Sequence, residues 1–205
     1  MDRPKISRAP GPAGRGAASV YRLRVTLCEG EPAVWRRVAA HSSTTLRDLH
    51  RIIQAVMPWG DIHLHHFAAH GFFFFGVPEE EDVKDVVHDE REVTLGALLR
   101  RRKDTLLYTY DFADEWRHTI VLEDILPDEA PIPRPRCIDG GGACPPEESG
   151  SLLGYREKIE IAGNPAHPQH GEVRGWLDRH ADGGHWDPAV FDCSAANARL
   201  AAICT

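Results

Sequence analysis

Residues 108–120 bring an acid, an indole and an imidazole close together, in the order Tyr-Thr-Tyr-Asp-Phe-Ala-Asp-Glu-Trp-Arg-His-Thr-Ile. An aspartate beside a histidine can orient the imidazole as a general base or as a metal ligand. We therefore take Asp111, Asp114, Trp116 and His118 as candidate site residues. The alternative is a buried polar contact that fixes the register of two strands and has no further role.

Alternating residue types on both sides of this stretch predict a β-hairpin. If residues 113–114 form a two-residue turn, Asp111 opposes Trp116 and Thr109 opposes His118. The first turn position normally favours glycine and is alanine here, so a longer loop is the alternative and would change the pairing. With the short turn, one face of the hairpin would hold Leu107, Thr109, Asp111, Trp116, His118, Ile120 and Leu122.

A second group of histidines could supply metal ligands. His63 and His65 have the i, i+2 spacing that places two side chains on one face of a strand, and His118 could be a third ligand. A divalent metal such as zinc would suit them. Cys137 and Cys144 are separated by six residues, which does not match common zinc sites, although with histidines they could complete one. The alternatives are half-exposed polar histidines and two packed thiols.

Two adjacent arginines, Arg36 and Arg37, lie in a predicted strand and must point to opposite faces. One should be exposed to solvent. The other could pair with a carboxylate or reach an anionic ligand.

The elements that must position these residues begin with strands at 21–27 and 34–38 and a helix from Thr45 to about Met57. His50 lies at the edge of the apolar stripe of that helix. Strands are expected near 63–67 and 72–75, the latter buried on both faces, followed by an exposed acidic loop at 77–92 and a short helix at 94–100. Irregular Cys/Pro/Gly residues at 137–150 precede helices near 154–161, 172–180 and 194–202.

The pattern predicts an α+β fold with a mixed or antiparallel sheet that opens strand-strand-helix, as in β-grasp-like domains. Residues 1–18 are expected to form a disordered basic tail, and residues 19–205 a single domain. The net charge of the 205 residues is −7, while the first 17 carry +3, so the remainder carries −10. This acidic balance argues against a broad nucleic-acid surface.

Neither a bilayer-spanning apolar run nor a secretory signal is visible in the sequence, and five cysteines fit reduced thiols better than a disulfide framework. We therefore expect a cytoplasmic protein with no membrane association.

Several motifs occur in one order along the chain. Together they resemble the plasmid pRiA4b ORF-3-like family, also described as TnpR-like passenger proteins of insertion elements, over residues 20–200. The motifs are Tyr21–Leu27, Val34-Trp-Arg-Arg37, Leu49-His50, Ile53-Gln54, Trp59, His63-Leu-His65, Tyr110-Asp-Phe-x-Asp114-x-Trp116-x-His118, Cys137-x6-Cys144-Pro-Pro-Glu147, Gly154-Tyr155 and Asp187-Pro-x-x-Phe191.

The resemblance implies an α+β domain linked to plasmids or mobile elements, without assigning an activity. Two positions depart from the family pattern, because Ala113 replaces the usual turn glycine and Ser149 stands where a third cysteine is frequent. The TnpR description suggests a resolvase, which is the least favoured function because the chain lacks a helix-turn-helix and a basic DNA-binding region.

Two functions remain. The first is a binding or adaptor module for a protein or small-molecule ligand, which the absence of P-loop, GxGxxG, HExxH and GxSxG motifs favours. The second is a metal-dependent enzyme, such as a hydrolase, with His63, His65 and His118 as ligands. Asp111 or Asp114 would then act as a base or orient a ligand.

Overall fold

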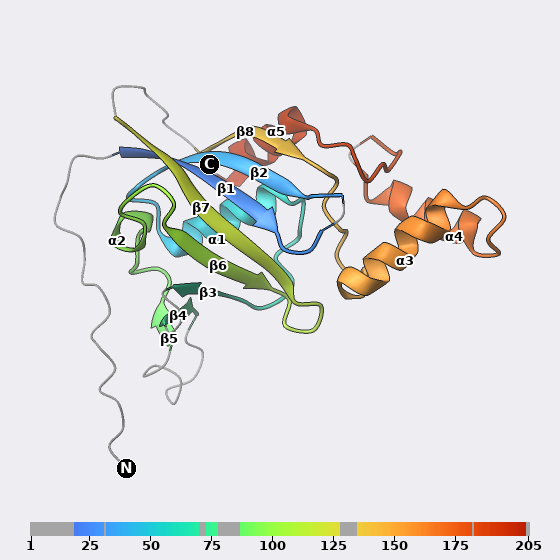
Figure 1. Cartoon of the computed structure of the whole chain (residues 1–205), viewed down its shortest axis with the longest axis horizontal. Coiled ribbons are helices and arrows are strands. Elements are labelled where there is room, and N and C mark those ends of the chain that lie inside the picture. The colour runs from blue at the N-terminus through green and yellow to red at the C-terminus, as the bar shows by residue number, and fades with distance from the viewer. Residues whose placement is uncertain are drawn as a thin grey trace, which may run out of the picture.

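The computed structural model describes residues 19–30, 32–69, 73–77, 87–127, 135–181 and 183–203 (Figure 1). The predicted tail at 1–18 lies outside these ranges. Eight strands form one sheet in the order β5-β4-β3-β6-β7-β1-β2-β8, and only β4 and β5 pair in parallel. The predicted α+β class with a mixed sheet is therefore confirmed.

The chain opens strand-strand-helix, as expected. The strands are β1 (Ser19–Leu27), β2 (Trp35–His41), β3 (His65–Ala69), β4 (Phe73–Gly76), β5 (Val87–Asp89), β6 (Thr105–Tyr110), β7 (Trp116–Pro127) and β8 (Arg136–Gly141). The helices are α1 (Leu46–Val56), α2 (Leu95–Leu98), α3 (Ser151–Gly163), α4 (His170–Arg179) and α5 (Cys193–Ile203). None of the helices in these ranges is long and apolar enough to cross a membrane.

Helix α1 begins where Thr45 caps it. The Thr45 hydroxyl accepts a hydrogen bond from the Asp48 N–H at 3.1 Å and donates one to the Asp48 carboxylate at 2.8 Å. The apolar stripe of α1 then packs on one face of the sheet, where Leu23 and Ile120 are fully buried beneath it. Helix α5 lies beside α1, and α3 and α4 extend from one end of the sheet (Figure 1).

Two predicted segments differ in the structure. The region 77–92, expected to be a loop, contains the short strand β5, which aligns Val87 with Phe74 of β4. Strand β4 is not buried on both faces, since Phe75 is buried but Phe74 is 39% exposed. Strands β5 and β4 are the last two strands at one end of the sheet. Residues 78–86 of the expected loop lie outside the described ranges.

The hairpin also differs from the two-residue turn. Tyr110 pairs with Trp116 and Tyr108 with His118, so residues 111–115 form a loop. The two tyrosines therefore replace Thr109 and Asp111 on the buried face, because a shift of one residue exchanges the faces of a strand. Leu107, expected on that face, is 50% exposed.

Asp111 explains this longer loop. Its φ of 59° is in the left-handed region, and its carboxylate accepts the N–H groups of Ala113 at 2.9 Å and Asp114 at 3.3 Å. Aspartate tolerates this conformation and builds its own turn. The loop therefore needs no glycine at position 113.

Candidate functional site

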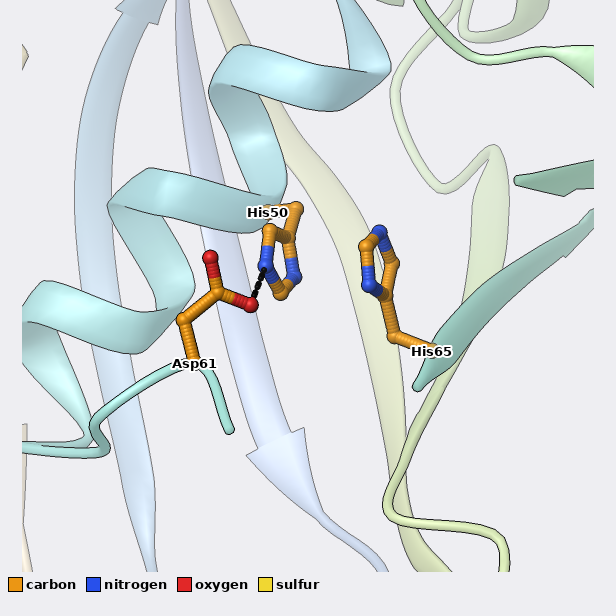
Figure 2. Close-up of side chains that lie close together, drawn as sticks. All are labelled: His50, Asp61 and His65. Atoms are coloured by element: carbon orange, nitrogen blue, oxygen red, sulfur yellow. Dashed lines mark hydrogen bonds and ion pairs between the residues drawn. The ribbon is translucent and has the colours of Figure 1, made fainter. Parts of the chain in front are cut away.

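Two histidines from different elements stack against each other at the edge of the core. His50 of α1 and His65 of β3 have ring centroids 3.5 Å apart and planes within 4° (Figure 2). Asp61, in the loop between them, lies with Oδ1 2.7 Å from His50 Nε2. One ligand atom from each of the three residues lies within 4.8 Å of the others. This His50–Asp61–His65 group is the one cluster of potential metal ligands found among the described residues.

The backbone of Asp61 is held in an uncommon conformation. Its φ is 55°, in the left-handed region, and its N–H donates to Gln54 Oε1 at 3.0 Å. Gln54 in turn donates through Nε2 to the Tyr108 hydroxyl at 3.0 Å. A non-glycine residue at positive φ costs about 1–3 kcal/mol and persists where surrounding contacts hold it, often at functional sites.

The second nitrogen of each histidine has a buried partner. His50 Nδ1 lies 2.8 Å from the Tyr108 hydroxyl, and His65 Nε2 lies 2.8 Å from Oε2 of Glu90, a residue that is 1% exposed. Such partners fix the orientation and tautomer of a ligand histidine. Burial, with a smaller contribution from His65, lowers the pKa of His50, and burial raises the pKa of Tyr108. His50 is therefore neutral at neutral pH, as metal binding requires.

This group forms part of the wall of an open pocket of about 860 Å³. Apart from the group and Glu90, the lining includes Arg47 and Arg51 of α1, the histidines His63 and His66, and apolar side chains from the residue before β3, from β4 and its end, from β5 and from the hairpin loop. The volume is in the range of small-molecule sites.

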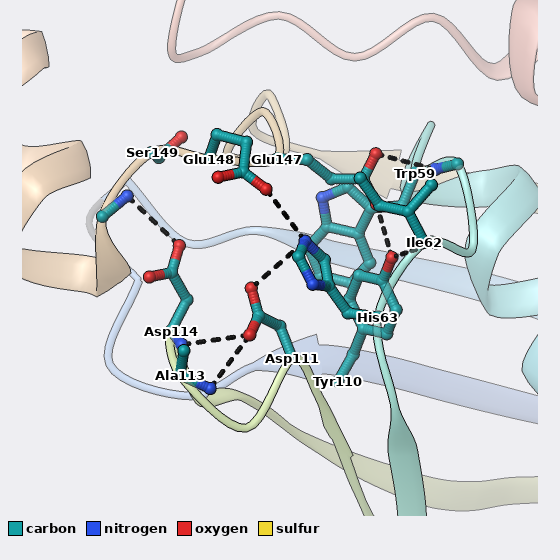
Figure 3. Close-up of polar contacts among 12 residues, drawn as sticks. Trp59, Ile62, His63, Tyr110, Asp111, Ala113, Asp114, Glu147, Glu148 and Ser149 are labelled. Carbon is teal, nitrogen blue, oxygen red and sulfur yellow. Dashed lines mark hydrogen bonds and ion pairs between the residues drawn. The ribbon is translucent and has the colours of Figure 1, made fainter.

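The hairpin residues form a second, separate cluster (Figure 3). His63 Nε2 lies 3.5 Å from Asp111 Oδ2 and 3.0 Å from Glu148 Oε1. Asp114 accepts the Gly150 N–H at 3.1 Å. The hairpin loop therefore docks on residues 144–150, which we call the Pro-Pro-Glu loop.

The Pro-Pro-Glu loop also contacts the segment that carries Asp61. Glu147 accepts hydrogen bonds from the Tyr110 hydroxyl and from the Gly60 N–H, and Trp59 Nε1 donates to the Pro145 carbonyl at 2.9 Å (Figure 3). Ser149, at the position of the family's third cysteine, is fully buried and donates to the carbonyl of a loop proline. These contacts give the motif residues of both loops a positioning role.

His118 and Trp116 lie in the aromatic core. The His118 ring packs edge-on against Trp59 at 5.4 Å between centroids and near Tyr108 at 5.5 Å. Its Nδ1–H donates to the Trp116 carbonyl at 3.0 Å, while its buried Nε2 has no hydrogen-bond partner in the described part of the chain. Burial lowers the pKa of His118 to about 4. The structure does not bring His118 together with His63 or His65 as ligands of one ion.

Cys137, Cys144 and Cys193 lie in β8, at the start of the Pro-Pro-Glu loop and at the start of α5, respectively. Cys137 and Cys144 are buried, and the Cys193 thiol donates to the Cys137 carbonyl at 3.4 Å. Burial raises the pKa of both Cys137 and Cys144 to about 12, which disfavours the thiolate that binds metals or attacks substrates. In the described ranges no histidine joins them in a ligand group.

The two adjacent arginines, Arg36 and Arg37, differ in burial and in the groups that they bind. Arg37 pairs with Glu123 at 2.6 Å and with Asp139 at 3.0 Å. Arg36 is 1% exposed and donates to three carbonyls, those of Val56 at 2.9 Å, Trp35 at 2.8 Å and Gly141 at 2.9 Å. Its guanidinium stacks 3.9 Å from the Phe191 ring centroid. Among the residues described, no carboxylate forms an ion pair with Arg36.

Sequence reasoning placed His63, His65 and His118 together. In the structure His63 and His65 line the same pocket but have different partners, and His118 lies in the core. Sequence reasoning missed His50, Asp61 and Glu90 as members of the site. The position of His50 at the edge of an apolar helical stripe was a usable signal, because that edge faces the neighbouring strand. Asp61 and Glu90 lie in irregular segments, where periodicity carries no information.

Comparisons with known proteins agree with this architecture. The family model described as "Plasmid pRiA4b ORF-3-like protein" matches residues 19–195. The uncharacterized protein y4hQ of Sinorhizobium fredii strain NGR234 is 37% identical over 180 residues, which are 88% of this chain and 87% of that protein. The crystal structure of MM3350, a protein of unknown function from Methanosarcina mazei Go1, superposes with a TM-score of 0.75 at 33% identity, covering 87% of this chain and 98% of that one. The chain therefore belongs to the plasmid pRiA4b ORF-3-like family.

Proposed function

We propose that the His50–Asp61–His65 group binds a divalent metal ion, with zinc the best match, and that the protein is a metal-dependent hydrolase. The convergence of three ligand atoms within 4.8 Å at the wall of an open pocket carries this proposal. Two imidazoles and one carboxylate are a donor set of catalytic zinc sites, which leave a further position for water. Bound zinc lowers the pKa of that water to near neutrality and so makes hydroxide available for hydrolysis.

Metal binding would change the histidine pair in a defined way. A metal ion lies near the plane of each imidazole that binds it, so two parallel rings cannot share one ion without tilting. The hydrogen bond between His50 and Asp61 must also be replaced by bonds to the ion. The Asp61 side chain is 55% exposed and can make this adjustment, while Tyr108 and Glu90 hold the opposite ring nitrogens.

A binding module without a reaction is the second candidate. The observation that favours it is the exposed apolar rim of the same pocket, where Leu64 is 57% and Phe112 is 51% exposed. Exposed apolar side chains around a cavity are typical of ligand sites in general. Metal content tests the metal site, and turnover of an ester by the zinc-loaded protein distinguishes the two functions.

The test is metal analysis and zinc titration of the purified protein and three variants. We expect about one zinc ion per chain, bound at least tenfold more weakly in His65→Ala and in Asp61→Asn. His63→Ala is the matched control, because His63 is a nearby histidine whose partners are Asp111 and Glu148. A protein that binds no zinc, or that loses zinc equally in the control, would refute the metal site.

Hydrolysis is tested separately with 4-nitrophenyl acetate, 4-nitrophenyl phosphate and bis(4-nitrophenyl) phosphate. Zinc-loaded protein should hydrolyse at least one of them, and His65→Ala or removal of metal with EDTA should abolish the activity. Stoichiometric zinc without turnover of any ester would favour the binding module and contradict the hydrolase.

A further inference from the structure

The lining of the pocket beside the His50–Asp61–His65 group is divided into a cationic side and an apolar side. We infer that its ligand is an amphipathic anion, with a phosphate or carboxylate head group at Arg47 and Arg51 and an aromatic or branched aliphatic body. This inference rests on the proposed function in that it names the ligand class of the same site.

The cationic side comes from the spacing along α1. Arg47, His50 and Arg51 occupy positions i, i+3 and i+4, which share one face of a helix, and all three line the pocket. An anion bound at this face would therefore lie next to the metal-binding group. Arginine is suited to phosphate and carboxylate because its planar fork can donate two parallel hydrogen bonds.

The two carboxylates that line the pocket among the described residues are already engaged. Asp61 pairs with His50 at 2.7 Å, and Glu90 pairs with His65 at 2.8 Å. Arg91 binds Asp89 at 2.5 Å and, with a smaller contribution from Arg47, lowers the pKa of that carboxyl. Within the part of the chain that the structure describes, neither pocket arginine forms an ion pair.

The other contacts of the two arginines leave donors available. Arg51 uses Nη2 to bind the Ile203 carbonyl at 3.1 Å, which holds the side chain without neutralising its charge. Arg47 contributes its backbone N–H to the Glu90 carbonyl at 3.3 Å, and its side chain is exposed. Two cationic groups beside a pocket, neither of them in an ion pair with a carboxylate of the described ranges, favour an anionic ligand.

The apolar side is formed by four exposed side chains from separate segments. Leu64 is 57%, Phe74 39%, Val77 47% and Phe112 51% exposed, and all of them line this pocket. His66 links the two aromatic residues, with ring centroids 5.5 Å from Phe74 and 5.3 Å from Phe112. An apolar ligand body would cover side chains that otherwise face water.

A pair of fluorescent probes with the same ring systems tests the inference. The anionic probe is 8-anilino-1-naphthalenesulfonate, and the neutral probe is N-phenyl-1-naphthylamine. We expect the full-length protein to bind both, with the anionic probe bound more tightly. Arg47→Gln/Arg51→Gln should weaken the anionic probe about tenfold, because it removes two exposed charge contacts that are each modest in water. The same variant should change the affinity for the neutral probe less than about twofold.

Matched controls use residues outside the pocket. Arg100→Gln/Arg117→Gln removes two exposed arginines, and it should leave both affinities unchanged. Leu64→Ser should weaken both probes, whereas Leu107→Ser, at a side chain that is 50% exposed, should weaken neither. Equal affinity for the two probes, or equal losses in pocket and control variants, would overturn the inference.

The probe titrations can fail or succeed independently of the proposed metal site. The titrations are repeated with His65→Ala and with EDTA-treated protein. If the arginine-dependent preference for the anionic probe persists in a protein that binds no zinc, the ligand class stands and the metal site fails. If zinc binds but the arginines have no effect on the anionic probe, the metal site stands and the ligand class fails.

Discussion

At the scale of single residues, burial decides which histidines can do chemistry. His118 carries the hydrogen bond to Trp116 that fixes its tautomer, and its Nε2 faces aromatic rings. Protonation there would place a charge in an apolar environment, which is why its pKa falls to about 4. A histidine of this kind stabilises the fold as a neutral aromatic side chain.

His118 should therefore make the stability of the fold depend on pH. The unfolded chain takes up a proton at this position from about pH 6.5 downward, whereas the folded chain does so only near pH 4. The unfolded state binds more protons in that window, so the free energy of unfolding falls as the pH falls. By linkage, His118 lowers the free energy of unfolding by about 3 kcal/mol between pH 7 and pH 4.

Urea unfolding at pH 7, 5.5 and 4 measures this effect. His118→Leu should lose less stability than the unsubstituted protein between pH 7 and 4, whatever its stability at pH 7. His185→Leu is the control, because the His185 side chain is 77% exposed. If His118→Leu and the unsubstituted protein lose the same stability between pH 7 and 4, His118 is not the cause of that loss.

Burial also decides how much Arg36 and Arg37 contribute to stability. Replacing Arg36 with methionine removes the guanidinium donor from three carbonyls, one of them in a buried hydrogen bond and two in partly buried ones, and we expect a loss of about 3 kcal/mol. Replacing Arg37 removes partly exposed ion pairs with Glu123 and Asp139, worth about 1 kcal/mol or less. Chemical denaturation of Arg36→Met and Arg37→Met compares them directly. Small effects of equal size would contradict the structural role of Arg36.

At the scale of elements, loops position the candidate site. The Pro-Pro-Glu loop reaches the segment between α1 and β3 through Glu147, whose carboxylate binds the Tyr110 hydroxyl and the Gly60 N–H. Gly60 directly precedes Asp61. The Glu147 carboxylate also raises the pKa of Tyr110, after the larger effect of burial, so the tyrosine remains a hydrogen-bond donor.

Glu147 should act on zinc binding without being a ligand. In Glu147→Ala we expect about tenfold weaker zinc binding, because supporting contacts typically contribute tenfold or more to metal affinity. Glu160→Ala, at an exposed position of α3, is the control for the loss of one acidic charge. Isothermal titration with zinc and the amide exchange of residues 59–62 would be measured together. Unchanged exchange and unchanged affinity would show that the loop does not position Asp61.

The element scale also shows what sequence could predict. Periodicity and capping residues correctly predicted the cap and apolar stripe of α1, the two opening strands and the existence of the hairpin. The register of the hairpin was missed because Asp111 forms its own turn at positive φ, a property of one residue that alternation does not reveal. The site was missed in part for a related reason, since Asp61 and Glu90 reach their histidines from irregular segments.

At the scale of the whole molecule, residues near the C-terminus pack against β2 and β8 of the sheet. Phe191 stacks on the Arg36 guanidinium, and its ring lies 2.4 Å from where a Cβ at position 140 would be, so glycine is required there. The Asp187-Pro-x-x-Phe191 motif thereby has a structural explanation. In the sequence this motif lies far from Arg36. The contact between the Phe191 ring and the Arg36 guanidinium explains why the chain carries both.

Helix α5 contacts the backbone of the edge strand β8 mainly through Asn197, with a weaker contact from the Cys193 thiol. Asn197 Oδ1 accepts the Cys137 N–H at 3.0 Å, and its Nδ2 donates to the Cys137 carbonyl at 2.9 Å. The amide thus pairs with the backbone of an edge strand as a neighbouring strand would, which also protects that edge from other chains.

Asn197→Ala should therefore destabilise the whole fold and not only the helix end. Loss of both hydrogen bonds leaves the partly buried Cys137 N–H without this acceptor and its carbonyl with only the weak Cys193 thiol donor, for an expected loss of about 2 kcal/mol in urea unfolding. Asn197→Asp separates the two bonds, because its carboxylate can still accept from the Cys137 N–H but cannot donate to the carbonyl. It should lose less stability than Asn197→Ala at pH 7. If both variants unfold at the same urea concentration as the unsubstituted protein, α5 is not coupled to the sheet through this amide.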